Sequence, residues 1–205
     1  IHWPWFVTAV LLCLVAAWLY LHWATPIYNI SATVLIKDEK KGGKYNMAKS
    51  NDDKTNVMRL LDKKKIDYKV HSYADTDAIA GTEVAAVLGE DAGCVFKTLV
   101  TVGKSNNHYV FMIPVACELD LKKAAKCVGE KKIEMIKSKD LLGLTGYIHG
   151  GCSPIGMKKL FKPTIDETAQ NYKRIFFSAG KIGFQIECSL SDLQKVVPVG
   201  LYDLT

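Results

Sequence analysis

Lys97 is the first residue of this sequence whose type and setting could do chemistry. It stands in the segment "VFKTLV", where apolar residues flank it on both sides. On an alternating strand, such a lysine either faces solvent or directs its ammonium group into a site. Spacing alone favours the outward position, because lysine is rarely buried without a partner.

A glycine-rich segment, "TGYIHGGCSPIG" at residues 145–156, is the second candidate. Its four glycines and one proline predict a loop whose backbone can approach a ligand and whose amides can bind an anion or a carbonyl oxygen. A purely structural turn is slightly favoured over this binding loop. His149 and Cys152 have H-x-x-C spacing, which suits either a metal pair or a nucleophile with its base, but two ligands alone make a poor metal site.

The third candidate is the segment "FFSAGKIGFQIE", in which Ser178, Gly180, Lys181 and Gly183 form a polar bend between apolar residues. Such a bend can hold a phosphate or a ribose hydroxyl, and it can equally be a plain hairpin turn. The sequence contains no Walker loop, zinc signature, G-x-S-x-G elbow or paired dinucleotide glycines. We therefore expect neither a metal nor a cofactor.

These candidates lie on a chain from Met47 onward that has the character of a mixed α/β domain. Asn51, Asp52 and Asp53 are predicted N-caps of a helix with apolar positions Val57, Leu60 and Leu61. Further helices are predicted at "TEVAAVLG", "LDLKKAAKCVG" and "SLSDLQKVV", and strands or hairpins at "IDYKVHSY", "CVFKTLVTVGKSNNHYVFMIPV", "KKIEMI" and "KRIFFSAGKIGFQIEC". Without strict βαβ alternation, this order predicts an α+β fold with a mixed sheet or barrel and surrounding helices.

The first 46 residues have a different composition. From Trp3 to Ala24 the sequence has no Asp, Glu, Lys or Arg, and this length matches the roughly 20 apolar residues that cross a bilayer as a helix. Tryptophans near both ends of the segment are typical of interfacial belts. A transmembrane helix is therefore predicted, with a buried core helix and a signal peptide as the alternatives.

Charge and cysteine content add little. The net charge of +6 permits a polyanionic partner such as nucleic acid without requiring one. The six scattered cysteines include no C-x-x-C pair, so reduced thiols in a cytosolic setting are expected.

The N-terminal segment, continued by "ATPIYNISATVLIKDEKKGG", resembles the start of Wzz-type polysaccharide chain-length determinants as far as about Gly43. No kinase motif or phosphate loop accompanies it. We therefore predict two parts, with residues 1–46 as a transmembrane-like helix, short strand and linker, and residues 47–205 as the functional domain. Met47 is expected to be the original start of that domain, with residues 1–46 an imported membrane fragment.

Six segments in order give the second part a strong resemblance to the YbaK-type aminoacyl-tRNA deacylases, which edit Cys-tRNA(Pro) and are related to the insertion domain of bacterial prolyl-tRNA synthetase. These segments are "TNVMRLLDKKKIDYKVHSY", "VFKTLV", "PVACELDLKKAAKCVGEKKIEM", "TGYIHGGCSPIGMKK", "PTIDETA" and "FFSAGKIGFQIE". The match runs almost without gaps from Met47 to the C-terminus. It implies that fold and a deacylase activity for this chain.

The resemblance also implies site residues. Lys97 falls on an essential lysine of the family, so the preference for an outward lysine reverses. Gly150 and Gly151 would offer backbone N–H groups to the ester carbonyl oxygen as an oxyanion hole, and Ser153 belongs to the same loop. Tyr73 falls on a family tyrosine suited to contact the terminal adenosine.

The glycine bend would bind substrate through Ser178, Gly180 and Lys181. One departure is Gln185, which stands where many members have an aspartate, so its part in binding or in substrate choice is in doubt.

On this interpretation the protein is a trans-editing deacylase that removes cysteine from Cys-tRNA(Pro), with the thiol of the mischarged cysteine attacking its own ester carbonyl. His149 and Cys152 are then bystanders. The expected partners are the acceptor end of tRNA(Pro) and prolyl-tRNA synthetase, in the cytoplasm, with a membrane anchor through residues 3–24 only if residues 1–46 are physiological. The alternatives are a deacylase for Ala-tRNA(Pro) or another small amino acid, and a membrane-anchored chain-length regulator.

Overall fold

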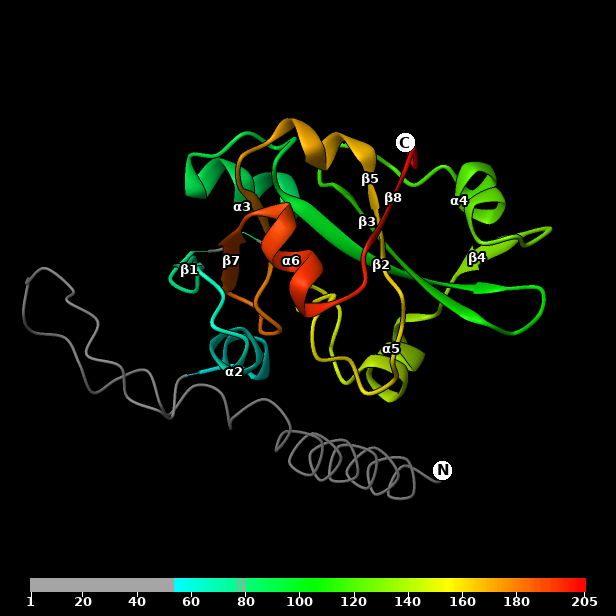
Figure 1. Cartoon of the computed structure of the whole chain (residues 1–205), viewed down its shortest axis with the longest axis horizontal. Helices are drawn as coiled ribbons and strands as arrows, with labels where there is room; N and C mark the ends of the chain where they lie inside the picture. Colours follow the sequence, from blue (N-terminus) through cyan, green and yellow to red (C-terminus); the bar gives the residue numbers. More distant parts are fainter. Residues whose placement is uncertain (1–53, 77, 79) are drawn as a thin grey trace, which may run out of the picture. The chain divides into compact units, whose positions relative to one another are not determined.

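The computed structural model describes residues 54–76, 78 and 80–205, which build two β-sheets (Figure 1). The larger sheet has five strands in the order β4-β2-β3-β5-β8. Strand β2 is antiparallel to both β3 and β4, whereas β5 is parallel to β3 and to β8. Its strands are β2 (Phe96–Gly103), β3 (His108–Pro114), β4 (Ile133–Met135), β5 (Thr164–Asp166) and β8 (Gly200–Tyr202).

The smaller sheet is antiparallel, with the order β1-β7-β6. It consists of β1 (Lys69–Ser72), β6 (Ile175–Ser178) and β7 (Phe184–Cys188). A parallel bridge between Val95 and Phe176 joins it to the start of β2. The predicted α+β fold with a mixed sheet is therefore confirmed.

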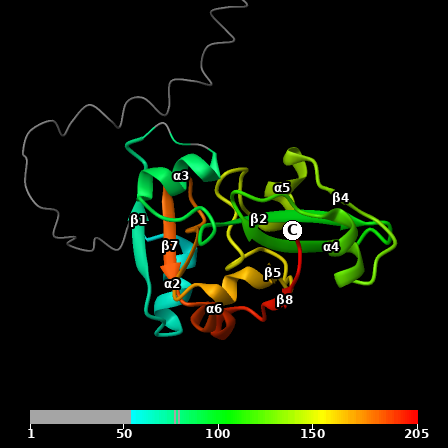
Figure 2. The same cartoon turned by 90° about the horizontal axis from the view of Figure 1, so that it is seen from above.

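Helices cover these sheets, as the two views in Figures 1 and 2 show. In both views α3 lies beside the three-stranded sheet, and α4 lies at the far end of the larger sheet near β4. The helices are α2 (Asn56–Lys63), α3 (Gly81–Leu88), α4 (Leu121–Cys127), α5 (Ser138–Thr145) and α6 (Leu190–Val196), with a 3-10 helix η1 (Glu167–Asn171) after β5.

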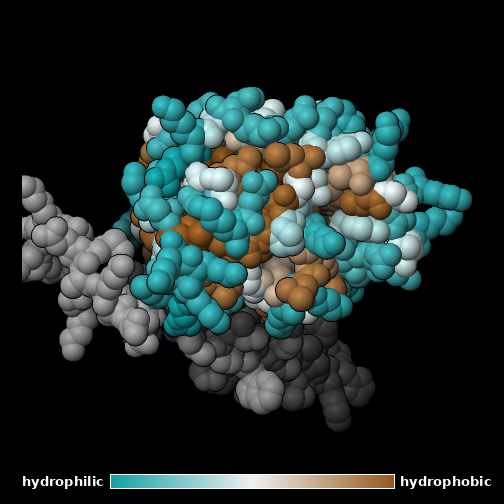
Figure 3. Space-filling view, in the orientation of Figure 1, coloured by the Kyte–Doolittle hydropathy of each residue, from teal (hydrophilic) through white to brown (hydrophobic). Residues whose placement is uncertain are grey.

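The main hydrophobic core lies between the two sheets and α2. Val57 and Leu61 of α2 are completely buried in it, together with Phe177 of β6 and Ile186 of β7. Apolar groups also reach the surface, and Figure 3 shows them gathered near the middle of one face with polar residues around them.

The predicted start of α2 was wrong. The N-cap is Thr55, whose side-chain oxygen accepts a hydrogen bond from the N–H of Met58 at 3.3 Å, rather than a residue of 51–53. The buried face formed by Val57, Met58 and Leu61 fixes where the helix begins, and Thr55 is the polar residue next to that start.

The predicted ends of the other helices agree better with the structure. Gly89 closes α3 with a φ of 70°, and Gly129 follows α4 with a φ of 73°. Ser189 caps α6 by accepting a hydrogen bond from the N–H of Asp192 at 3.1 Å.

None of the helices that the structure describes could span a lipid bilayer. The predicted transmembrane segment Trp3–Ala24 and the predicted boundary at Met47 lie outside the described residues.

Asp166 ties the end of β5 to η1 and to the C-terminal residues. Its carboxylate is 1% exposed and accepts hydrogen bonds from the N–H of Thr168 at 3.0 Å and the N–H of Leu204 at 2.9 Å. We expect Asp166→Ala to lower the free energy of unfolding by about 2–3 kcal/mol, because the buried N–H of Leu204 loses its acceptor. Urea denaturation measures this change.

The matched control is Asp203→Ala, which removes an exposed carboxylate from an ion pair with Lys123. This variant should change the free energy of unfolding by about 0.5 kcal/mol or less. Equal urea midpoints for the Asp166 and Asp203 variants would contradict the role given to Asp166.

Candidate active site

A pocket of about 270 Å³ opens beside β2, between α3 and the glycine-rich loop that follows α5. Five successive residues of β2, from Phe96 to Val100, form one of its walls. Residues from α3, β4, α5, β6, β7 and the glycine-rich loop also line it. Segments far apart in the sequence therefore meet at this one cavity.

The structure brings five of the nine predicted site residues to this pocket and leaves four outside its lining. Those that line it are Tyr73, Lys97, Gly150, Ser178 and Gln185. The remaining four are Gly151, Ser153, Gly180 and Lys181, and each of these belongs to one of the two glycine-containing turns beside the pocket.

Lys97 is half-buried in the pocket wall rather than placed on an outer strand face. Its Nζ donates a hydrogen bond to the carbonyl oxygen of Val115 at 3.3 Å. In the part of the chain that the structure describes, Lys97 makes no ion pair with a carboxylate. Its charge is therefore available to an anionic or carbonyl group in the pocket.

The glycine-rich loop contributes Gly150 to the pocket lining. Gly150 lines the pocket with a φ of 81°, a conformation that favours glycine, and its N–H makes no hydrogen bond to the described residues. The N–H of Gly151 donates to the carbonyl oxygen of Ile148 at 3.0 Å, and the buried Ser153 hydroxyl accepts from the N–H of Ile155 at 3.4 Å. The N–H of Gly150 is therefore left without a partner in the described part of the chain, whereas the hydrogen bonds of Gly151 and Ser153 lie within the loop.

The glycine bend between β6 and β7 places Ser178 in the pocket, with its hydroxyl accepting the N–H of Gly180 at 3.2 Å. Gly180 has a φ of 83°, and a Cβ there would lie 2.9 Å from side-chain atoms of both Tyr147 and Val57. Close packing against Tyr147 and Val57 therefore leaves no room for a side chain at position 180. Lys181 is exposed, with its Nζ 5.3 Å from the centre of the Phe184 ring.

His149 and Cys152 both line the pocket but do not form a catalytic pair. No hydrogen bond joins them within the described residues, and His149 is exposed. Burial raises the pKa of the Cys152 thiol to about 12, which a hydrogen bond with Thr145 only partly offsets. A thiol with this pKa stays protonated near neutral pH and is a poor nucleophile.

The candidate metal pair gains no further ligand from the fold. Among the described residues, no group of three or more His, Cys, Asp or Glu side chains could hold a metal ion. His149 and Cys152 therefore have the sequence spacing of metal ligands, but the described residues supply no third or fourth ligand beside them.

Sequence reasoning missed several residues of the pocket. Thr98 lines it, and the buried Oγ1 of Thr98 has no hydrogen-bond partner among the described residues. Its place next to Lys97 in "VFKTLV" was an available signal. The apolar wall residues Val84, Val115 and Leu141 carried none, because apolar residues at such spacing are the ordinary content of a core.

Comparison with known proteins identifies the family. A family model described as the aminoacyl-tRNA editing domain matches residues 74–196. A relative from Enterococcus faecalis, named "Putative Cys-tRNA(Pro)/Cys-tRNA(Cys) deacylase EbsC", is 51% identical over 140 residues, which cover 68% of this chain and 85% of the relative.

Two crystal structures share the fold. One is described as "a putative trans-editing enzyme for prolyl tRNA synthetase", with a TM-score of 0.64, 24% identity, and coverage of 74% of this chain and 98% of that one. The other, hypothetical protein APE2540, has a TM-score of 0.66 and 19% identity, with coverage of 72% and 97%. The chain therefore belongs to the aminoacyl-tRNA editing domain family, and aminoacyl-tRNA deacylation, which the sequence resemblance implied, is its activity.

Proposed function

We propose that the protein is a trans-editing enzyme that hydrolyses Cys-tRNA(Pro). The observation that carries this proposal is the 51% identity, over 140 residues, to a relative named as a Cys-tRNA(Pro)/Cys-tRNA(Cys) deacylase. The pocket beside β2 supports the proposal because Lys97 and Gly150 line the same small, largely apolar space.

Lys97 and Gly150 would act on the acceptor end. The ammonium group of Lys97 suits the negative charge of the terminal nucleotide or the oxygen of its ester. The N–H of Gly150 would donate to the ester carbonyl oxygen as negative charge develops on it, which lowers the barrier to attack. The backbone fixes the N–H of Gly150, and a hydrogen bond to the carbonyl oxygen of Val115 holds the ammonium group of Lys97.

The cysteinyl group would supply its own nucleophile. Its sulfur forms a bond to the ester carbonyl carbon, the bond from that carbon to the ribose oxygen breaks, and the thiol proton passes to the departing ribose oxygen. The products of this step are a cyclic thioester of cysteine and a free tRNA 3′ end, and water then opens the thioester. The protein contributes positioning and carbonyl polarisation, which agrees with the protonated state of Cys152.

This proposal includes tRNA(Pro) as the tRNA, prolyl-tRNA synthetase as a partner and the cytoplasm as the place of action, since aminoacyl-tRNA is used there. The domain boundary at Met47 is also part of the proposal. The role of residues 1–46 as a membrane segment lies outside the described residues and stays a prediction.

Substitution of Lys97 and Cys152 tests which of these two side chains contributes to deacylation. We expect Lys97→Ala to lower kcat/KM for Cys-tRNA(Pro) deacylation about 100- to 1,000-fold, because a preorganised charge is lost. We expect Cys152→Ser to keep the rate within about 3-fold of wild type, since the thiol supplies neither a nucleophile nor a base. Release of labelled cysteine measures both rates, and thermal unfolding confirms that each variant is folded. A folded but inactive Cys152→Ser protein would show that the enzyme, and not the substrate, provides the nucleophile.

The choice of amino acid is tested by comparing Cys-tRNA(Pro), Ala-tRNA(Pro) and Ser-tRNA(Pro) under the same conditions. Substrate assistance requires a side-chain nucleophile of thiol strength, so we expect hydrolysis of the cysteinyl ester to be at least about 100-fold faster than that of the alanyl ester. The seryl ester, which differs by one atom, serves as the matched control. Faster removal of alanine would favour the alternative deacylase for small amino acids.

The proposed domain boundary gives a further expectation. A chain that begins at Met47 should deacylate Cys-tRNA(Pro) with the same kcat/KM as the full chain, because every pocket residue lies between Tyr73 and Gln185. A loss of more than about tenfold in a folded shortened chain would assign residues 1–46 a part in the activity.

A further inference from the structure

The side chain of Gln185 is a buried polar group that the described residues leave without a partner. It is 8% exposed, it lines the pocket, and its Oε1 accepts no hydrogen bond in the described part of the chain. Buried amide oxygens are usually hydrogen-bonded, because an unpaired one loses its interactions with water and gains nothing in return. A ligand with suitable groups would restore what Gln185 lacks.

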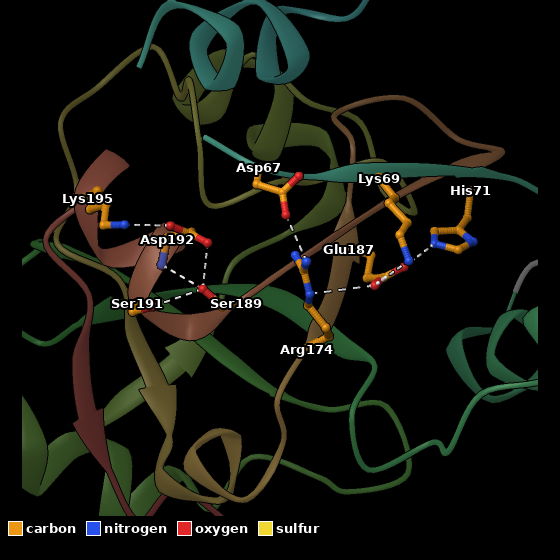
Figure 4. A network of polar contacts seen from close by, with 9 residues as sticks. All are labelled: Asp67, Lys69, His71, Arg174, Glu187, Ser189, Ser191, Asp192 and Lys195. Atoms are coloured by element: carbon orange, nitrogen blue, oxygen red, sulfur yellow. Dashed lines mark hydrogen bonds and ion pairs between the residues drawn. The ribbon is translucent and has the colours of Figure 1, made fainter. Parts of the chain in front are cut away.

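The neighbours of Gln185 are already bonded to other groups. On the three-stranded sheet Gln185 pairs with His71 on one side and with Ser178 on the other. The Nε2 of His71 lies 2.7 Å from Oε2 of Glu187, and Figure 4 shows these two side chains directed at one another beside Lys69. The Ser178 hydroxyl accepts the N–H of Gly180. The amide of Gln185 is therefore left for the pocket.

An aromatic ring lies on the same face of this sheet. Tyr73 follows β1, and its N–H donates to the carbonyl oxygen of Gly183 at 2.8 Å, which continues the pairing of β1 with β7. Since Gln185 is opposite His71, alternation along the strand places Tyr73 diagonally across from Gln185 on one face. Tyr73 is 5% exposed and also lines the pocket. An amide and an aromatic ring thus line one cavity, together with the apolar side chains of Val84 and Val115.

An amide and an aromatic ring are together suited to an adenine base. The amide of glutamine can accept from the N6 amino group of adenine and donate to N7 at the same time, and an aromatic side chain can stack on the base. The acceptor strand of every tRNA ends in adenosine. We propose that Gln185 reads the adenine ring of the terminal nucleotide through N6 and N7, with Tyr73 against the ring; this proposal rests on the proposed deacylase function.

The proposed contact orients the rest of the acceptor end. With adenine against Tyr73 and Gln185, the ester would lie near Lys97 and Gly150, which line the same cavity. Gln185 is then a substrate-positioning residue that serves any tRNA, and selectivity for the amino acid depends on the groups around the ester.

The test uses the full chain and Cys-tRNA(Pro) whose terminal adenosine is replaced by 7-deazaadenosine, which lacks N7, or by purine riboside, which lacks the N6 amino group. For the wild-type protein we expect kcat/KM to fall about 3- to 10-fold with each replacement, as for the loss of one neutral hydrogen bond. The fall should appear mainly in KM. In Gln185→Ala the rates on all three substrates should be equal.

Gln185→Glu is the most informative variant because an ionised carboxylate accepts but does not donate. It should remain sensitive to loss of the N6 amino group and become insensitive to loss of N7. Gln194→Ala, which removes an exposed glutamine amide of α6, is the matched control and should behave as wild type on every substrate.

Two results would overturn the proposal. The first is a wild-type rate that neither replacement of the adenine changes. The second combines two observations: removal of N7 leaves kcat/KM unchanged, and replacement of the substrate's α-amino group by hydroxyl lowers kcat/KM in the wild type but not in Gln185→Ala. Together they would show that Oε1 of Gln185 binds the α-ammonium group and not the adenine.

Binding of an amide-linked 3′-cysteinyl adenosine analogue, measured by calorimetry with and without N7, separates this proposal from the proposed function. If the analogue binds in a manner that depends on N7 and on Gln185, but the protein hydrolyses no Cys-tRNA(Pro), only the proposed function is contradicted. If the protein hydrolyses Cys-tRNA(Pro), but the analogue binds equally well without N7, only the proposed contact between Gln185 and adenine is contradicted.

Discussion

The short junction between the two sheets determines the geometry of the pocket. The carbonyl oxygen of Cys94 accepts the N–H of Phe176 at 2.9 Å across the junction, and the carbonyl oxygen of Val95 accepts the N–H of Val115 at 2.8 Å, which continues the pairing of β2 with β3. Because the bridge between Val95 and Phe176 is parallel, Lys97 and Ser178 each lie two residues beyond it, and both line the pocket.

A buried carboxylate stabilises the three-stranded sheet next to this junction. Glu187 is 7% exposed and contacts three cationic or titratable side chains, with Lys69 at 3.4 Å, His71 at 2.7 Å and Arg174 at 3.8 Å (Figure 4). Burial acts to raise the pKa of Glu187, but hydrogen bonds from His71 and Lys69 outweigh it and hold that pKa below its usual value. Because His71, the cross-strand neighbour of Gln185, is hydrogen-bonded to Glu187, it does not pair with the Gln185 amide. The network that stabilises the sheet therefore also leaves that amide without a partner.

Prediction from the sequence succeeded where local patterns decide the structure. The hairpins β2–β3 and β6–β7 follow from runs of β-branched and aromatic residues broken by polar turns, and both were predicted. The strands β5 and β8 have three residues each, too few to show alternation, and they form only by pairing with distant segments. The direction of the Lys97 side chain was ambiguous for a related reason. Buried residues occur on both faces of β2, so strand alternation alone cannot say which face meets a cavity. Thr98 and Val115 join the site only through that tertiary arrangement.

The chemistry of the pocket is consistent with catalysis by positioning. Burial raises the pKa of Cys152, which lines the pocket, to about 12 and so disfavours its thiolate as a nucleophile. The described residues that line the pocket include Lys97, Gly150 and two residues with unpaired polar atoms, Thr98 Oγ1 and Gln185 Oε1. Unpaired polar atoms destabilise the folded chain, so their persistence in one cavity is expected where a ligand completes their hydrogen bonds. An ester that carries its own thiol needs to be held near such groups and little else, because an oriented intramolecular attack already has much of its entropic cost removed.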